Sequence, residues 1–516
     1  MVSLPKVGQG HNMHTTDGEE GPYISIPQFY AGRSVFITGG TGFMGKILVE
    51  KLLRSCPEIE NIYLLMRPKR GQEVSSRLND LLNSNIYDKI RREKLDDLKK
   101  VVPICGDVTL MQLGISESDQ ELLCRNVSVV YHLAATIKFD EKLELAVKIN
   151  MLGTRNLLEL CRRMTHLDAL LHVSTSFSNC DRSEIQEIVY PLPYDPDDII
   201  NLVRWLPEDM IEKLTPMLIG KRPNTYTFTK ALTEQMVLKE AGSLPVAIVR
   251  PSIVVACYDE PTPGWLDCFS GPTYLLAAIG NGVLRSVMLE NDFLCDMVPV
   301  DYVSNMMITI SWRTATAKPH RIIVYNCVNS NRQPITWSQF VNNSLTHIIR
   351  HPLEGVIWYP TAILHTNRLK HTILHYLVHY LPAHILDFLS WSMGKKQIMV
   401  RTHNRVTEAA VIGRYFVTNQ WYFTDDNMRE LLTYMSSSDR NTFQFDVTQI
   451  NWNSFYEPFA VGLRTYVFKQ SPKSLPNSRK RMTRLYLLHQ TSKFLLATCT
   501  IISAWRFFVY LRGAFR

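Results

Sequence analysis

The chain has 516 residues, of which 46% are hydrophobic and 20% are charged, with a net charge of +8. This length allows two or three domains with a large core, and the composition excludes a disordered chain. The ten cysteines contain no Cys-x-x-Cys pair, which argues against a disulfide framework or a zinc site and favours a reducing compartment. Residues 1–25 lack the apolar core of a signal peptide, so we expect a flexible N-terminus.

The first structural motif is a strand, a glycine-rich turn and a helix. Residues 35–37 are a short apolar run, residues 38–45 are rich in glycine, and apolar residues recur at helical spacing from residue 47. In such a unit the glycines allow a tight turn, a close approach of backbone N–H groups to a pyrophosphate, and close packing of helix on strand. The helix N-terminus then faces the negative charge of the ligand. The residues expected at a dinucleotide are Thr38, Gly39, Gly42, Phe43, Met44 and Gly45.

The next two strands are expected at residues 62–66 and 101–105. The tip of the second strand of a dinucleotide fold meets the adenosine ribose. This tip is basic, with Arg67 and Lys69, so a 2′-phosphate would find cationic partners and NADP(H) is favoured over NAD(H). Asp107 follows the third strand, at a position suited to the adenine edge.

The following segments continue the alternation of strands and helices. A fourth strand at residues 127–131 leads to the small residues Ala134 and Ala135, which leave room for the cofactor backbone. A helix is expected at residues 145–162, and a fifth strand at residues 170–173 ends in Ser174, Thr175 and Ser176. This pattern predicts an α/β fold with a doubly wound parallel sheet that binds ligands at its carboxyl edge.

The candidate catalytic residues are Tyr226 and Lys230 together with Thr175 or Ser176. Tyr226 and Lys230 are four apart and share a helix face. A lysine ammonium beside a phenol is expected to lower the phenol pKa, which makes the tyrosine a proton donor near neutrality, while a strand-end hydroxyl orients the substrate oxygen.

Two further strands complete the domain, which we place at residues 26–345. They are expected at residues 246–249, followed by Pro251 at the cofactor, and at residues 322–326. Residues 261–301 are expected to face the substrate.

The remaining chain differs in composition and reads as a mainly helical domain at residues 350–470. Residues 373–391 are apolar but contain three histidines and Asp387, which favours an interfacial or buried helix over a membrane span. Residues 471–493 are a basic linker, suited to an anionic membrane surface rather than nucleic acid, or simply solvated. Residues 494–511 have a single charge and predict a C-terminal membrane anchor, with a surface or packed helix as alternatives.

The combined motifs resemble the extended short-chain dehydrogenase/reductases, and more closely the fatty acyl-CoA reductases of the insect type. The resemblance rests on the turn 38–46, Val-Ser-Thr at 173–175, Tyr-x-x-x-Lys at 226–230, Pro-Gly-Trp-Leu-Asp at 263–267 and Val-Pro-Val-Asp-Tyr at 298–302. It implies a Rossmann-type domain that uses NADPH, without a metal, to reduce a long-chain acyl-CoA to a primary alcohol through an aldehyde that is not released. It also implies an organelle membrane, peroxisomal or endoplasmic reticulum, with the catalytic domain facing the cytosol.

Two other functions share these motifs. An epimerase of nucleotide sugars or a hydroxysteroid dehydrogenase would have the same tyrosine and lysine, but would not predict the helical C-terminal domain. A catalytically inert NADP-binding membrane scaffold would not need Thr175, Tyr226 and Lys230 together. The oligomeric state is left open, with a homo-oligomer as one alternative.

Overall fold

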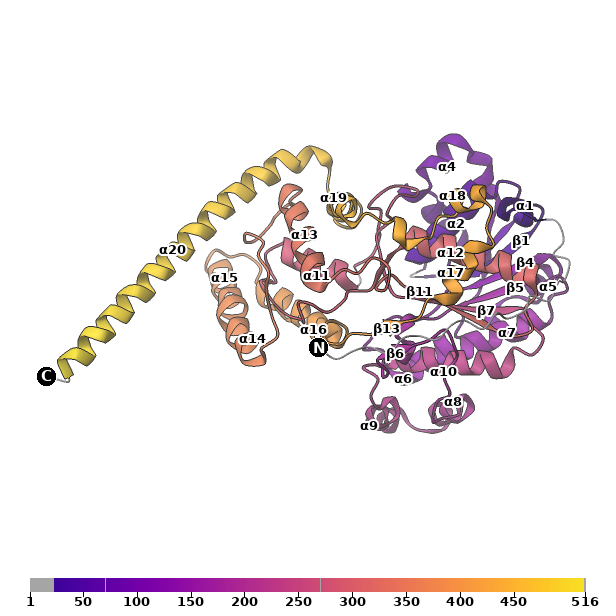
Figure 1. The fold of residues 1–516 in the computed structure, drawn as a ribbon, viewed down its shortest axis with the longest axis horizontal. Helices are drawn as coiled ribbons and strands as arrows, with labels where there is room; N and C mark the ends of the chain where they lie inside the picture. Colours follow the sequence, from indigo (N-terminus) through magenta and orange to yellow (C-terminus); the bar gives the residue numbers. More distant parts are fainter. Residues whose placement is uncertain (1–22, 70, 270, 515–516) are drawn as a thin grey trace, which may run out of the picture.

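The computed structural model describes residues 23–69, 71–269 and 271–514, so most of the N-terminal segment expected to be flexible lies outside the described residues. A parallel sheet of seven strands forms the centre, in the order β11-β7-β5-β4-β1-β2-β3 (Figure 1). This confirms the doubly wound sheet predicted from the sequence. Its strands are β1 (Ser34–Thr38), β2 (Ile62–Met66), β3 (Val101–Cys105), β4 (Val127–His132), β5 (Ala169–Val173), β7 (Val246–Pro251) and β11 (Ile323–Cys327).

Both faces of the sheet are covered, so its central strands are buried along their whole length. Val35 and Ile37 point into one apolar core, and Phe36 points into a second core on the other face. The helices that cover the sheet include α2 (Phe43–Ser55), α5 (Glu117–Asn126), α7 (Gly153–Arg162), α10 (Thr225–Glu240) and α12 (Val300–Ala317). The strand order reverses beside β1, and in such sheets the ligand crevice opens at this point.

The other elements of the first 350 residues lie outside this sheet. The segment 181–222 forms one two-residue strand and two helices. The helices are α1 (Ile26–Tyr30), α3 (Val74–Leu82), α4 (Asp88–Glu93), α6 (Leu143–Ala146), α8 (Pro196–Trp205), α9 (Glu208–Ile219), α11 (Gly271–Gly280) and α13 (Trp337–Arg350). The short strands are β6 (Glu184–Ile185), β8 (Ile253–Val255), β9 (Ser286–Met288) and β10 (Met297–Pro299).

The chain after residue 350 is mainly helical, as predicted. Its helices are α14 (Arg368–Leu374), α15 (Leu381–Ser392), α16 (Met399–Val417), α17 (Asp426–Thr433), α18 (Ser437–Thr442), α19 (Trp452–Gly462) and α20 (Leu475–Ala514), with the short strands β12 (Ile363–His365) and β13 (Tyr422–Phe423). A π-helical segment, His375–Tyr380, joins α14 to α15, so residues 368–392 form one continuous helix, called the 368–392 helix below.

The C-terminal region, from residue 350 onward, shares a core with the domain at residues 26–345, called the reductase domain below. The closest approach is between the turn at Gly264 and helix α19. A Cβ atom on Gly462 would lie 1.8 Å from the carbonyl oxygen of Gly264, and one on Gly264 would lie 2.0 Å from the carbonyl oxygen of Pro458. Gly264 also has a positive φ of 73°, a conformation that favours glycine. The Pro-Gly-Trp motif therefore has a packing role, because only glycines permit this contact.

Helix α20 leaves the body of the protein (Figure 1). Its first turns are packed, with Met482 and Leu485 buried and Arg481 bonded to the carbonyl of Val356. The basic segment 471–493 is therefore mostly helical rather than an extended linker. Among the described residues, Pro472–Gly513 is the one helix long and apolar enough to cross a membrane, and its apolar window has no buried residue.

Glu187 joins the two regions close to the β6–β13 strand pair. Its carboxylate accepts hydrogen bonds from the backbone N–H groups of Asn326, at 2.9 Å, and Asn427, at 2.6 Å. Burial raises the pKa of Glu187 to about 7, although both N–H groups oppose the shift. The ionised form is thus disfavoured in the folded protein.

This predicts a pH-dependent stability that Glu187→Gln removes. A carboxyl whose folded pKa is raised stabilises the fold below its unfolded value of about 4.5 and loses that contribution as the pH rises through about 7. The free energy of unfolding of the wild type should fall by about 2 kcal/mol between pH 5 and pH 8 relative to the variant. Denaturant unfolding at both pH values measures this difference. Glu184→Gln, an exposed neighbour, is the control, and identical pH profiles for wild type and Glu187→Gln would contradict the assignment.

Candidate active site

The glycine turn that follows β1 lies against the end of β4. Gly39 has a positive φ of 74°, and a Cβ atom there would lie 2.7 Å from the backbone nitrogen of Ala134. Gly42 is exposed at the N-cap of α2. A Cβ atom on Gly45 would lie 2.5 Å from the carbonyl oxygen of Gly39, so this glycine packs against the turn itself rather than against the strand. The turn therefore presents an open backbone at a helix N-terminus, which suits a phosphate.

Thr38 and the ring of His132 pack under this turn. The Thr38 hydroxyl lies 2.7 Å from His132 Nδ1 and accepts a hydrogen bond from the N–H of Ala134. Burial lowers the pKa of His132 to about 3, and the charge of Lys230 adds to this shift. Because Thr38 is fully buried and already bonded, its side chain positions the turn instead of facing a ligand.

Two aromatic side chains lie beside the start of α2. Phe43 stacks on Trp265 with ring centroids 5.8 Å apart. Lys46 forms an ion pair with Asp267. The 263–267 motif therefore packs against the expected cofactor turn, and Met44 is partly buried beside it.

The basic residues at the end of β2 meet an acidic residue at the end of β3. Arg67 Nη1 lies 3.1 Å from Asp107 Oδ2, and the Arg67 side chain is 60% exposed. Burial raises the pKa of Asp107, but hydrogen bonds from Thr109 and the hydrogen bond and charge of Arg67 outweigh this effect. The pKa of Asp107 is therefore lowered overall. Lys69 is exposed on the same tip. The exposed Arg67 guanidinium is thus available to an anionic ligand at this edge, and the Asp107 carboxylate holds it in position.

Thr175 and Tyr226 form the centre of the candidate site. The Thr175 hydroxyl lies close enough to the phenol of Tyr226 to lower the phenol pKa, and it accepts the N–H of Phe177 at 3.3 Å. Ser176 is fully buried, and its hydroxyl has no hydrogen-bond partner among the described residues. The geometry therefore links Thr175, rather than Ser176, to the tyrosine.

The sequence predicts that Lys230 lowers the pKa of Tyr226, but in the structure this pKa is raised. Burial raises the pKa of Tyr226 to about 12, and the Thr175 hydrogen bond only partly offsets it. Lys230 is not among the causes; its ammonium donates to the carbonyl oxygen of Val173 at 2.8 Å. Burial lowers the pKa of Lys230 to about 8. The phenol accordingly stays protonated at neutral pH, which is the state of a proton donor.

Asn150 is a buried polar residue that the sequence pattern did not indicate. It lies in the π-helical segment Val147–Leu152. Its side chain accepts the N–H of Thr136 at 3.0 Å and donates to the hydroxyl of Thr229 at 2.9 Å. It thereby connects the loop after β4 to the helix turn beside Lys230, and π-bulges occur often at functional sites. The signal in the sequence that could have indicated this residue is an asparagine, Asn150, among apolar helix residues.

A buried ion pair lies under the site. The Glu234 carboxylate accepts hydrogen bonds from Arg250 Nε at 2.9 Å and Nη2 at 2.6 Å, and both side chains are almost fully buried. It also accepts the hydroxyls of Ser174 and Ser178, on either side of Thr175. Pro251 follows Arg250 at the buried end of β7. Sequence reasoning missed Glu234, although it continues the four-residue spacing of Tyr226 and Lys230.

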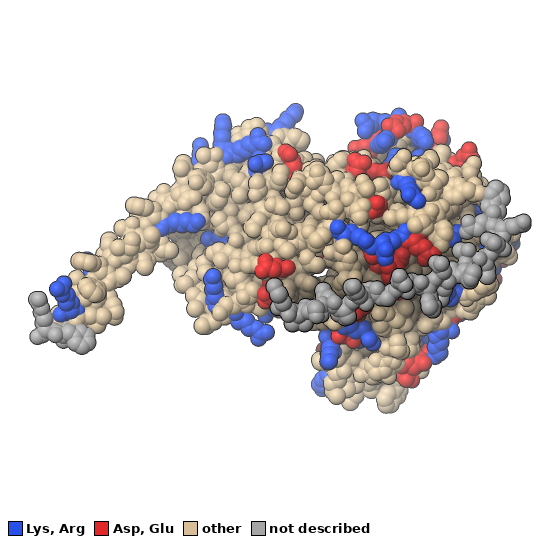
Figure 2. Space-filling model, in the orientation of Figure 1, with Lys and Arg blue, Asp and Glu red and all other residues tan. Residues whose placement is uncertain are grey.

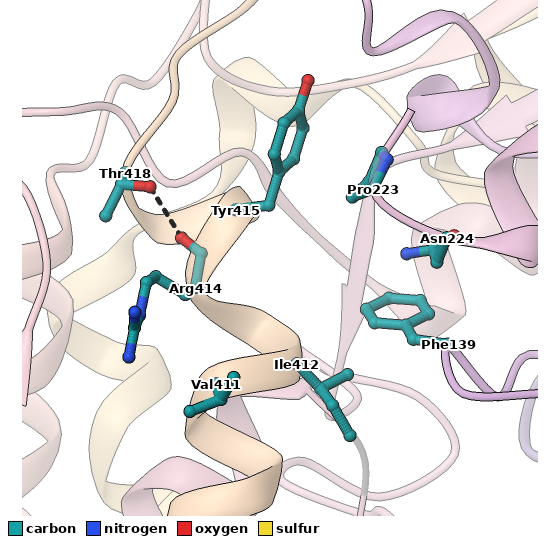
Figure 3. A pocket seen from close by; sticks show the side chains of 8 residues that line it. All are labelled: Phe139, Pro223, Asn224, Val411, Ile412, Arg414, Tyr415 and Thr418. Carbon is teal, nitrogen blue, oxygen red and sulfur yellow. Dashed lines mark hydrogen bonds between the residues drawn. The ribbon is translucent and has the colours of Figure 1, made fainter. Parts of the chain in front are cut away.

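A cavity of about 400 Å³ opens next to the tyrosine, between the reductase domain and helix α16 (Figure 3). Phe139 lines the cavity on one side and stacks on Tyr226, with ring centroids 5.9 Å apart. Tyr415 lies opposite, and its hydroxyl donates to the carbonyl of Cys180. The lining residues are Phe139, Pro223, Asn224, Val411, Ile412, Arg414, Tyr415 and Thr418.

The predicted site residues thus lie along one edge of the sheet. Gly39, Ala134 and Ala135 follow β1 and β4, and Thr175 follows β5. Arg67 and Asp107 follow β2 and β3. Because all these strands are parallel, their carboxyl ends share one side of the molecule.

Comparison with known proteins agrees with this arrangement. An NAD-binding family model described as "Male sterility protein" matches residues 37–307. A second model, named "Sterile" and also described as "Male sterility protein", matches residues 378–470. The chain is 38% identical to "Fatty acyl-CoA reductase 1" of Gallus gallus over 489 residues, which cover 94% of each chain. It is 37% identical to "Fatty acyl-CoA reductase 2" of Mus musculus over 484 residues, covering 94% of this chain and 93% of the other.

Solved structures show the same fold at lower identity. The terminal R domain of the myxalamid PKS-NRPS pathway gives a TM-score of 0.57 at 20% identity, over 84% of this chain and 90% of that one. The reductase domain of a non-ribosomal peptide synthetase from Mycobacterium tuberculosis gives 0.55 at 18% identity, over 86% and 93%.

The buried pair predicts a large loss of stability in Glu234→Gln. Removing one charge leaves the Arg250 guanidinium buried without its counter-ion, which should reduce the free energy of unfolding by about 3 kcal/mol. Thermal unfolding in detergent measures this loss. Glu121→Gln, which breaks an exposed pair with Arg125, should cost less than about 1 kcal/mol. Replacing both partners, Glu234→Leu with Arg250→Met, should recover part of the loss, and equal effects of the buried and exposed single variants would refute the prediction.

Proposed function

Because the chain belongs to the fatty acyl-CoA reductase family and reduces a fatty acyl-CoA to an alcohol, we propose that it does so with NADPH in two hydride transfers through a bound aldehyde. Thr175, Tyr226 and Lys230 act at the reacting centre in this proposal. The observation that carries it is the placement of the Thr175 hydroxyl next to a protonated Tyr226, whose pKa it lowers, at the carboxyl edge of the parallel sheet.

The described residues fit a dinucleotide phosphate. Gly39 leaves a cradle against Ala134 that a Cβ atom would fill, and Gly42 exposes the N-terminus of α2. Gly42, Phe43 and Met44 would hold the pyrophosphate and Ala134 and Ala135 the cofactor backbone. Arg67, with Lys69, would bind a 2′-phosphate. When bound, NADPH supplies the hydride for each reduction.

Proton transfer in each step is assigned to Tyr226. As negative charge develops on the thioester oxygen, the Tyr226 hydroxyl donates its proton to that oxygen, and Thr175 holds the oxygen in place by a hydrogen bond. The resulting hemithioacetal expels the CoA thiol and leaves the aldehyde. The second reduction places charge on the same oxygen, so the same Thr175–Tyr226 pair serves again and yields the primary alcohol.

Lys230 supports this transfer electrostatically. Its ammonium is fixed at the end of β5 by Val173, and the pKa of about 8 keeps most of it charged at neutral pH. A positive charge next to the reacting oxygen favours the anion that forms there during reduction. The lysine can also hold the nicotinamide ribose.

The substrate is proposed to approach through the cavity between Phe139 and α16. Its mixed lining suits a chain that is apolar at one end and carries an amide-rich arm at the other. The apolar part of α20 is proposed to anchor the protein in a peroxisomal or endoplasmic reticulum membrane, with the reductase domain in the cytosol. A long-chain acyl-CoA partitions to the same membrane surface.

The test is product analysis of the purified full chain with NADPH and long-chain acyl-CoA. Chromatography should show a primary fatty alcohol and free CoA, with two NADPH consumed per alcohol. An inert scaffold would form no product. An enzyme that acts on sugars or steroids would leave acyl-CoA unchanged.

Tyr226→Phe should abolish alcohol formation while NADPH still binds. The phenylalanine keeps the stacking on Phe139 but cannot donate a proton, so the rate should fall by about a hundredfold or more. Turnover is measured by alcohol formation, and binding by the fluorescence of the reduced nicotinamide. Thr175→Val should also lose activity, whereas Ser176→Ala should retain most of it. Unchanged turnover in Tyr226→Phe would exclude the acid role.

Arg67→Ala should weaken NADPH more than NADH. The variant loses a charge-assisted contact to the 2′-phosphate and leaves Asp107 to repel it, so KM for NADPH should rise about tenfold. KM for NADH should change little, because NADH has no 2′-phosphate. Steady-state kinetics with both cofactors measures the ratio, with the exposed Lys99→Ala as control. An equal loss for both cofactors would discredit the contact.

A further inference from the structure

The 368–392 helix turns an apolar side outward. Its exposed large apolar residues recur at spacings of three and four, so they lie on one side of the helix. We call this side the outer face; its residues, each between 41% and 70% exposed, are Leu369, Ile373, Tyr376, Leu377, Tyr380, Leu381, Ile385, Phe388 and Leu389. A contiguous apolar surface of this length is rare on a protein that meets only water.

The inner side of the same helix is polar. The His375 ring lies 4.9 Å from the ring of His403 on α16, and the His379 ring lies 5.5 Å from it. His379 Nε2 also accepts the backbone N–H of Arg285 at 2.8 Å. The helix is thus reversed relative to a surface helix of a soluble protein, which buries its apolar side. Ionisable groups that face the protein while apolar groups face outward are typical of elements in contact with lipid.

The charges around this helix are almost all positive. Asp387 is the one acidic residue between positions 368 and 405. Its carboxylate accepts the N–H groups of Met399 and Val400, at 2.9 Å each, and so caps α16 instead of facing outward. Basic side chains flank the outer face at both ends, namely Arg368, Lys370, Lys395 and Lys396, all exposed. In Figure 2, Lys and Arg predominate at this end of the molecule. Such flanks fit anionic lipid headgroups.

The position of α20 indicates what covers the outer face. The 368–392 helix lies at the end of the molecule from which α20 projects (Figure 1). Among the described residues, only α20 has the length and composition of a span. The 368–392 helix carries four histidines and an aspartate, which suits an interfacial position better than the hydrocarbon centre.

We propose that the outer face of the 368–392 helix lies in the headgroup region of the same phospholipid bilayer that α20 enters, and forms a second, interfacial membrane contact. Anionic lipids strengthen this contact through the basic flanks. Helix α16 follows it directly, and its last residues line the cavity beside Tyr226. Helix α16 has 19 residues and is about 28 Å long, and it connects the 368–392 helix to this cavity along the chain.

The test uses nitroxide labels on the full chain in vesicles of phosphatidylcholine and phosphatidylserine. Labels are placed at Leu377→Cys and Leu389→Cys, in a background where the accessible Cys105, Cys268 and Cys499 are serine. Met111→Cys, an apolar residue of the reductase domain that is 88% exposed, is the matched control. The collision rates of each label with oxygen and with a water-soluble nickel chelate are compared in detergent and in vesicles.

The proposal expects both helix labels to lose nickel collisions severalfold and gain oxygen collisions in vesicles, while the control does not change. The effect should be smaller in vesicles without phosphatidylserine, and smaller again in Lys395→Gln with Lys396→Gln. If the helix labels keep the nickel accessibility of the control, the outer face is not in the bilayer. Dipolar broadening between two labelled copies without oxygen exposure would also overturn the proposal, in favour of a contact between chains. Retained alcohol formation by the labelled proteins shows that they are folded, and its outcome is independent of label depth.

Discussion

The site depends on one face of helix α10 held against the end of strand β5. Tyr226, Lys230 and Glu234 are spaced four residues apart, and each faces a different part of the strand end. Tyr226 lies near the Thr175 hydroxyl, Lys230 bonds the Val173 carbonyl, and Glu234 bonds the Ser174 hydroxyl. The three contacts together fix the rotation of the helix. Because two of them are made by buried ionisable groups, a shift of the helix would leave charges unsatisfied, which is costly in the interior.

The sequence predicted the central strands of the sheet well because they are buried on both faces. Such strands are short continuous apolar runs, and the expected bounds of the strand ending at Met66 match those observed. The bounds of the edge strand β3 also match, although it is only partly buried. The edge residues Arg67 and Thr175 followed from where strands end. By contrast, the pKa of Tyr226 depends on how much water the fold removes and on where the lysine points, and neither is visible in a four-residue spacing.

Contacts between distant segments could not be read from the sequence. The fit of Gly264 against Gly462 joins residues almost two hundred positions apart, and each glycine alone has many ordinary explanations. The π-helical turn that places Asn150 depends on packing against α10. The direction of the histidine face on the 368–392 helix likewise depends on α16 and Arg285. In each case the sequence shows the local pattern but does not show which distant segment packs against it.

The helical region lines the candidate active site as well as carrying the proposed anchor. Tyr415 and Trp421 both donate to the carbonyl of Cys180, which ends the short helix after Thr175, and Phe416 packs on Phe139 and Phe177. These aromatic rings shield the tyrosine from solvent on the side of the cavity. The proposed two-step reduction would need such a wall, because an aldehyde that left a site near a bilayer would dissolve in the bilayer before the second hydride arrived. The 368–392 helix, which is proposed to contact lipid, packs on the start of α16, and the end of α16 carries Tyr415 and Phe416 of this wall. In this proposal, membrane contact and retention of the aldehyde therefore depend on the same helix.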